Sequence, residues 1–254
     1  MTMTATSKPR AAALPREVAM RLAAAEYQRF VQLLRGLRPE DWTKPTECAG
    51  WDVRAMAAHA LGMVEMAASI GEQVRQNRAA KARQSQRGGL LIDALTSVQV
   101  DERAEMTPEQ IVARFAARAP KAARGRRRAP GFIRRRQLPA LQDVGGAKEA
   151  WTFGYLIDVI LTRDPWMHRV DIARATGARH VLTPDHDGVL VADVVAEWAA
   201  RHGQPYTLRL TGPTGGEWSS GTGRPVIAMD AVDFCRAVSG RGPADGLLTT
   251  AVPF

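Results

Sequence analysis

The sequence contains few cysteines and no long apolar segment. Its two cysteines, Cys48 and Cys235, allow at most one disulfide and form no CxxC motif, which excludes a cysteine-based metal site and is typical of a reducing compartment. No run of about 18 apolar residues that could span a membrane is present, and the N-terminal residues lack the apolar core of a signal peptide. We therefore expect a cytoplasmic protein that does not enter a membrane.

Aromatic residues are also sparse, at 6%, and positive charge is concentrated in one segment. The net charge is +9, and residues 121–136 hold eight basic residues and no acidic one, so the rest of the chain is nearly neutral. Phe132 is the one aromatic residue in this segment, and no nucleic-acid-binding motif accompanies it, which argues against nucleic acid as a partner. We expect a solvated, mobile connection between two helices, with anion recruitment and nucleic-acid binding as the alternatives.

Four long amphipathic helices are expected in the first part of the chain. The hydrophobic fraction of 45% and the charged fraction of 24% are those of a folded globular protein. Apolar residues recur every three or four positions, and Asp52 and Thr107 are residue types that cap helix N-termini. The expected helices cover 17–36, the residues after Asp52, the residues after Thr107 and 149–175, where Pro165 introduces a kink.

The pattern changes after Gly177 to shorter elements separated by turn residues. We expect a helix over 184–203, strands over 206–211 and 225–229, a short helix over 231–239 and a last strand over 247–254. The sequence thus predicts an α+β fold. Its parts are a disordered tail over 1–15, a four-helix bundle over 16–178 and a small α+β C-terminal domain over 179–254.

His59, Asp164 and His168 are the residues that could share a metal ion. Asp164 and His168 are four positions apart on the fourth helix, so their side chains lie on one face about one turn apart. Two histidines and a carboxylate on facing helices form a ligand set typical of catalytic zinc, which leaves coordination positions open. The alternatives are a buried core histidine at His59 and a surface ion pair of Asp164 with Arg163 or Arg169.

Asp171 follows His168 by three residues and has two interpretations. Its carboxylate could accept a hydrogen bond from the imidazole and so fix the tautomer of the ring. It could equally pair with Arg174 on the helix surface. The sequence leaves both open.

Three stretches resemble the mycothiol-dependent maleylpyruvate isomerase family of actinobacteria. They are ECAGWDVRAMAAH (47–59), TRDPWMHRVDIARATG (162–177), and the ending FCRAVSGR (234–241) with GLLTTAVPF (246–254). The resemblance covers nearly the whole chain. It implies a DinB-like four-helix bundle that binds a divalent metal, usually taken as zinc, followed by a small α+β C-terminal domain.

The resemblance also assigns roles to individual residues. It places His59 on the family's second-helix ligand, His168 on the histidine of its fourth-helix pair, and Asp164 where the founding type has a glutamate. The aspartate arm is shorter by one methylene, about 1.5 Å, compared with metal–oxygen distances of about 2.0–2.2 Å. Either the helix compensates, or Asp164 reaches the metal through water, or tight metal binding has been lost.

An arginine of the C-terminal domain completes the site that the resemblance implies. A guanidinium group can hold a substrate carboxylate with two hydrogen bonds. Arg241 is the candidate, and Arg236 in the preceding helix is the second choice.

The function implied by the resemblance is that of a mycothiol-dependent metalloenzyme. A metal-bound thiolate of mycothiol adds to a small electrophilic substrate, such as an unsaturated carboxylic acid. Elimination after bond rotation gives cis–trans isomerisation of the maleylpyruvate type, whereas a persistent adduct makes the protein a thiol S-transferase. The protein is expected to be a monomer or a homodimer.

Two other functions fit the residues. One is a non-enzymatic binding protein that uses the basic segment 121–136, whose binding weakens steeply with salt. The other is a metal-dependent hydrolase on the same bundle, in which water replaces the thiol as nucleophile.

Overall fold

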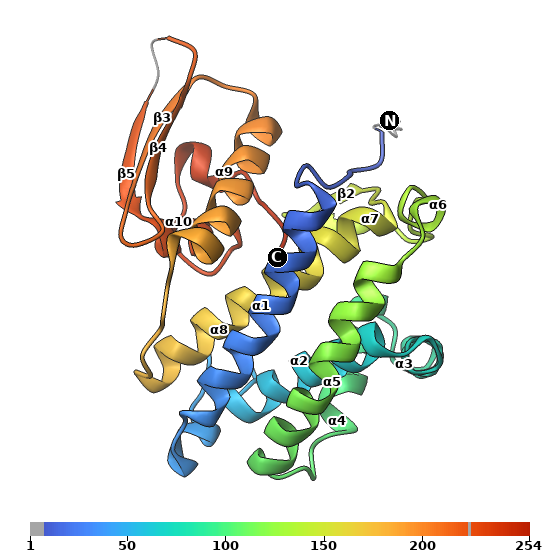
Figure 1. Ribbon diagram of the computed structural model, residues 1–254. Coiled ribbons are helices and arrows are strands. Elements are labelled where there is room, and N and C mark those ends of the chain that lie inside the picture. The colour runs from blue at the N-terminus through green and yellow to red at the C-terminus, as the bar shows by residue number, and fades with distance from the viewer. Residues whose placement is uncertain (1–7, 223–224) are drawn as a thin grey trace. The chain divides into compact units, whose positions relative to one another are not determined.

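The computed structural model describes residues 8–222 and 225–254, which form two compact units. The bundle unit consists of Arg16–Pro130 and Asp164–His180, and the sheet unit consists of Met1–Pro15, Gly131–Arg163 and Val181–Phe254. The units differ from the expected domains because 131–163 belongs with the C-terminal residues and not with the bundle. Figure 1 shows the labelled helices and strands.

The bundle unit is helical throughout. In chain order its helices are α1 (Arg16–Arg35), α2 (Val53–Ala68), α3 (Ile70–Arg87), α4 (Leu91–Asp101), α5 (Pro108–Arg128) and most of α8 (Leu161–Thr176), with a short 3-10 turn at Pro39–Thr43. None of the described helices is long and apolar enough to cross a bilayer.

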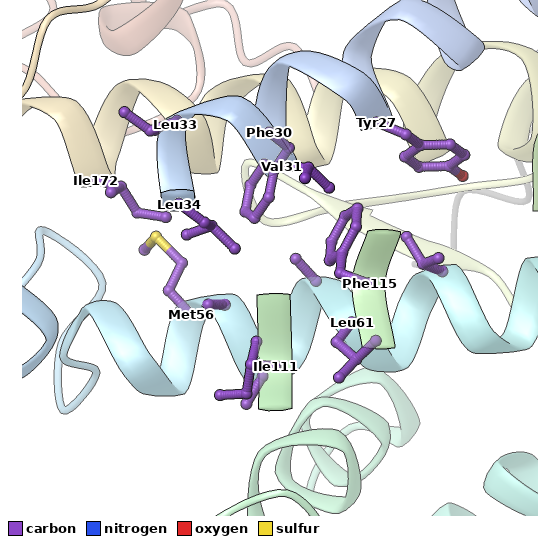
Figure 2. Close-up of a cluster of buried hydrophobic side chains, with 14 of the residues drawn as sticks. Tyr27, Phe30, Val31, Leu33, Leu34, Met56, Leu61, Ile111, Phe115 and Ile172 are labelled. Carbon is purple, nitrogen blue, oxygen red and sulfur yellow. The ribbon is translucent and has the colours of Figure 1, made fainter. Parts of the chain in front are cut away.

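The core of this unit lies between α1, α2, α5 and α8, which form the expected four-helix bundle. Phe30 of α1 stacks on Phe115 of α5 with ring centroids 5.1 Å apart. Figure 2 shows these rings among Met56 and Leu61 of α2 and Ile172 of α8. Burying each such side chain contributes about 1.5–3 kcal/mol to folding.

Local sequence signals set the starts of two bundle helices. Asp52 caps α2, where its Oδ1 accepts a hydrogen bond from the Ala55 amide at 2.7 Å. Thr107 and Gln110 form a capping box at the start of α5. Both predicted starts are therefore confirmed.

Neither α3 nor α4 is among the helices expected from the sequence. Gln76 and Ala80 are the buried residues of α3, so this helix lacks the apolar stripe that predicts an amphipathic helix. Polar contacts hold it instead, because the buried Gln76 amide donates to the Gly62 carbonyl and accepts a hydrogen bond from Gln99 of α4.

The basic segment 121–136 is helical, which corrects the expectation of a mobile connection. Helix α5 continues to Arg128, and α6 (Gly131–Arg134) follows directly. Alanine and arginine favour helix, and the helix stops where Pro130 disfavours helical backbone at the preceding residue. Arg16 of α1 donates to the last carbonyl groups of α5, and the buried Arg126 donates to Tyr27 Oη at 3.0 Å.

The sheet unit contains a small three-stranded sheet and several short helices. Strand β3 (Tyr206–Thr211) is central, antiparallel to β4 (Gly216–Ser220) and parallel to β5 (Val226–Asp230). Helices α9 (Val189–His202) and α10 (Ala231–Val238) lie on one face of this sheet (Figure 1). Leu208 and Leu210 of β3 are buried, as the alternating pattern predicts.

The remaining elements of this unit lie between α5 and α8, just before α9 and near the chain end. They are the hairpin β1 (Gln142–Val144) and β2 (Ala147–Glu149), the helical turn α7 (Phe153–Tyr155), the π-helical turns Leu156–Ile160 and Pro184–Gly188, and a 3-10 turn at Gly246–Thr249.

Three further expectations about the elements need correction. The helix expected over 149–175 begins at Phe153, because Thr152 caps it and the residues before it form β2. Strand β4 lies between the two expected strands, in a segment rich in glycine and serine where the sequence predicts no strand. The last strand expected over 247–254 is a 3-10 turn followed by irregular chain, in which Pro253 has no N–H to donate to a strand.

A network of buried charges holds the sheet unit together. Arg163 is 1% exposed and binds Asp193 at 2.6 Å and Glu197 at 2.8 Å, and Tyr155 donates to Glu197 at 2.7 Å. Arg10 pairs with Glu149 at 3.2 Å and bonds to the backbone of Ala150. The expected disordered tail is therefore held in place at Arg10, while its residues 1–7 lie outside the described residues.

Candidate metal site

The bundle unit brings His59, Asp164 and His168 together. His59 lies on α2, and the other two residues lie one turn apart on α8. The two Asp164 oxygens face one imidazole each, with Oδ1 3.3 Å from His168 Nε2 and Oδ2 3.6 Å from His59 Nε2. Three potential ligand atoms of these residues all lie within 4.8 Å of one another. The shorter aspartate arm thus does not keep the carboxylate away from the histidines.

The cluster is enclosed by the helices and by the loop that precedes α2. His59 and His168 are 3% and 4% exposed, and their rings meet edge to face with centroids 5.2 Å apart. Trp51, at the end of this loop, lies against both imidazoles, with centroid distances of 5.1 Å to His59 and 6.1 Å to His168. Water therefore has limited access to the imidazole nitrogens.

The loop over 46–51 folds back on itself, which places Trp51 and Cys48 beside the cluster. The Thr46 hydroxyl donates to the Trp51 carbonyl at 2.8 Å and accepts from the Cys48 amide at 3.3 Å. Gly50 has φ +80°, which favours glycine. The sequence predicts no role in the site for Trp51 or Cys48. The one sequence signal that could have placed them near the site is their position just before Asp52, the cap of α2.

Opposite charges stabilise each other within the cluster. Burial disfavours the charged imidazole of His168, but the neighbouring Asp164 carboxylate outweighs it and holds the pKa of His168 well above its usual value. Burial likewise acts against ionised Asp164, yet His168 and His59 keep the pKa of its carboxyl well below the usual range. In the absence of an ion, Asp164 is therefore an anion beside a protonated His168.

The cluster fits a divalent ion in its donor types and spacing. A tetrahedral ion with bonds of about 2.0–2.2 Å to nitrogen and oxygen separates its ligand atoms by about 3.4 Å. The two imidazole–carboxylate distances of 3.3 and 3.6 Å bracket this value. Asp164 Oδ2 is buried and has no hydrogen-bond partner among the described residues, and such an atom usually costs about 1–3 kcal/mol.

The two arginines that the sequence offers as ion-pair partners of Asp164 bind other carboxylates in the structure. Arg163 binds Asp193 and Glu197, and Arg169 binds the buried Glu26 at 2.8 Å. Asp164 instead faces the two imidazoles, so its environment is that of a ligand cluster.

Asp171 lies on the far side of the His168 ring. Its side chain is fully buried, with Oδ2 3.4 Å from His168 Nδ1 and 3.9 Å from Cys48 Sγ. Arg174 pairs with Glu47 at 3.2 Å. The carboxylate thus faces the imidazole at the distance of a long hydrogen bond, and that it fixes the tautomer stays a prediction.

Arg241 and Arg236 belong to the sheet unit. Arg241 lies in the turn after α10, where its amide donates to the Arg236 carbonyl and its carbonyl accepts from the Arg236 guanidinium. Arg236 also pairs with Asp233 at 3.3 Å. That either residue holds a substrate carboxylate stays a prediction.

Comparisons with known proteins agree with the resemblance noted in the sequence. A family model described as the mycothiol maleylpyruvate isomerase N-terminal domain matches residues 23–173, a range that contains His59, Asp164 and His168. No curated protein sequence matches significantly.

Two solved structures have the same fold. One is described as the mycothiol-dependent maleylpyruvate isomerase, with a TM-score of 0.56 and 17% identity, and the other as a histidine-to-alanine mutant of that enzyme, with a TM-score of 0.55 and 16% identity. Each alignment covers 90% of this chain and 90% of the other. At this identity the likeness establishes the α+β fold with its helical N-terminal part. Because the family model spans more than half of the sequence, the chain belongs to the mycothiol maleylpyruvate isomerase family.

Proposed function

We propose that this protein is a mycothiol-dependent isomerase of the maleylpyruvate type, with a divalent metal ion held by His59, Asp164 and His168. The His–Asp–His cluster, in which both imidazole Nε2 atoms lie within 3.6 Å of one carboxylate, carries the proposal. Family membership and the names of the two structural neighbours support the reaction type.

Two histidines and one carboxylate suit zinc and leave coordination positions for other molecules. When bound there, the ion supplies Lewis acidity, which lowers the pKa of a thiol ligand and polarises a substrate carbonyl. Mycothiol supplies the nucleophile, whose reversible addition to a cis double bond permits rotation about that bond.

The residues of the chain prepare the cluster for these partners. With an ion bound, Asp171 would accept a hydrogen bond from His168 Nδ1, which would leave the Nε2 lone pair for the ion. Trp51 covers both rings and limits hydration, so charges in the cluster interact more strongly than they would in water. Arg241 is the candidate that binds a carboxylate of the substrate.

Metal content tests the site. Protein purified without a histidine tag should contain about one zinc or similar ion per chain, in line with a single three-ligand site, and the double variant His59→Ala, His168→Ala should contain none. His202→Ala is the matched control, because this histidine lies at the end of α9 in the sheet unit. Native protein that takes up no ion even after reconstitution contradicts the proposal.

The fate of the thiol tests the reaction. With maleylpyruvate and mycothiol, an isomerase consumes substrate while the thiol concentration stays constant over many turnovers. Loss of one thiol per substrate identifies an S-transferase, and turnover without thiol identifies a hydrolase. Either of these results contradicts the isomerase proposal and leaves the metal site in place.

A further inference from the structure

A second group of metal-ligating atoms lies beside the first, on the Nδ1 side of the His168 ring. Cys48 Sγ, Asp171 Oδ2 and His168 Nδ1 come from the loop over 46–51 and from α8. The thiol lies 3.9 Å and the imidazole 3.4 Å from the same carboxylate oxygen, and ligand atoms of all three residues lie within 4.8 Å of one another. This cluster shares His168 with the first but adds one sulfur ligand, so the cysteine count excludes only a metal site built from several cysteines.

The spacing also fits an ion. An N–H···O hydrogen bond prefers about 2.7–3.2 Å, so the 3.4 Å imidazole–carboxylate contact is a long hydrogen bond that leaves room for an ion to take its place. A tetrahedral ion with bonds of about 2.3 Å to sulfur and about 2.1 Å to nitrogen and oxygen would set these separations at about 3.6 and 3.4 Å. The observed 3.9 and 3.4 Å are close to both values.

Burial and access also favour a site here. Asp171 is 0% exposed and His168 is 4% exposed, so two of the ligands are fixed and shielded from water. Cys48 is only partly buried and is not in a disulfide, so its sulfur can be approached from solvent. The Thr46 hydrogen bonds hold the loop in the position that aims this sulfur at Asp171.

We propose that Cys48, Asp171 and His168 Nδ1 form a second metal site, which takes a thiophilic divalent ion such as Cd²⁺. Thiolate sulfur selects soft ions over hard ones, and binding displaces the thiol proton. A neutral imidazole has one lone pair, so His168 can serve the second site or the first but not both. A thiophilic ion at Cys48 therefore competes with the ion at His59 and Asp164.

The inference goes beyond the proposed function, because it needs neither mycothiol nor a substrate. Metal-free, full-length protein is titrated with Cd²⁺ in a buffer without added thiol, and the ultraviolet charge-transfer absorption of a thiolate–cadmium bond is recorded. The wild type should develop this band with one ion per chain. Cys48→Ser should lose it, and circular dichroism confirms that the variant is folded.

Two matched variants complete the experiment. Cys235→Ser removes the fully buried cysteine of α10 and should keep the band, and His59→Ala removes a ligand of the first site only and should also keep it. A wild type that binds Cd²⁺ without the band, with binding lost in His59→Ala, overturns the second site and leaves the first intact. A band that survives in Cys48→Ser overturns it as well.

Discussion

At the scale of single residues, the length of the Asp164 side chain determines how the cluster is built. A glutamate would extend the carboxylate by about 1.5 Å, yet the aspartate already places one oxygen near each imidazole. Each oxygen thereby faces one histidine, so side chains of α2 and α8 both lie near the same negative charge. The charge of Asp164 matters more than its reach.

This predicts different effects for two substitutions at the same position. Asp164→Asn keeps the shape of the side chain but removes its charge. Mutating a residue that only hydrogen-bonds to a metal ligand typically lowers metal affinity ten- to hundredfold, so we expect this variant to lose at least that much affinity for Zn²⁺. Asp164→Glu keeps the charge and should bind within about tenfold of the wild type. Competition with a chromophoric chelator measures both. Equal affinities for the wild type and Asp164→Asn would show that the carboxylate is not a ligand.

The sequence predicted part of this cluster directly. The four-residue spacing placed Asp164 and His168 on one helical face without knowledge of the fold. The approach of His59 depends on the packing of α2 against α8, for which the family resemblance was needed. Cys48 and Trp51 approach the cluster through a loop that folds back by hydrogen bonds to Thr46, and no periodic pattern encodes such a contact.

At the scale of elements, the pairing of α3 and α4 with α2 depends on buried charge. Glu65 of α2 and Arg103, just after α4, are each 3% exposed and form an ion pair, and Arg114 of α5 joins them. By contrast, Arg75 of α3 is 48% exposed where it pairs with Glu72 and Glu102. Arg103 and Arg75 therefore allow the stability contributions of a buried and an exposed ion pair to be compared within one part of the fold.

We expect Arg103→Met to destabilise the protein by about 3 kcal/mol, because it leaves Glu65 buried with only the half-exposed Arg114 as a partner. Arg75→Met should cost at most about 1 kcal/mol, the usual value of an exposed pair. Urea unfolding followed by circular dichroism compares the two. Similar losses in both variants would mean that the buried pair contributes no more than the exposed one.

The elements that could be predicted are those with their own local signals. Capping residues and apolar periodicity located α1, α2 and α5, and alternation located β3. Helix α3 has no apolar stripe, and three of the five residues of β4 are glycine or serine, which usually mark turns, so both elements are specified by the partners they pack against. The charge of the basic segment 121–136 predicted a solvated connection, although its alanine content favours helix.

At the scale of the whole molecule, each unit is assembled from separate stretches of the chain. The buried Asp193 and Glu197 of α9 depend on Arg163 and Tyr155, which precede the boundary expected from sequence. A cut at residue 178 would therefore separate buried charges from their partners.

We expect a fragment of residues 179–254 to lack a cooperative unfolding transition, because the buried Asp193 would lose Arg163 and Glu197 would keep Arg201 but lose Arg163 and Tyr155. The longer fragment 131–254 contains Arg163 and Tyr155 and should unfold cooperatively. Thermal unfolding followed by circular dichroism distinguishes them. A shorter fragment that melts like the longer one would show that 131–163 is dispensable for the sheet unit.

The arrangement of the ligand cluster also has a consequence for protein synthesis. His59 precedes the α8 pair by about 100 residues, which a ribosome needs roughly 5–20 s to add. During that interval α2 has been synthesised while α8 does not yet exist. An ion that requires all three ligands can be bound only after translation has passed His168. Until then, the nascent chain carries His59 without its metal.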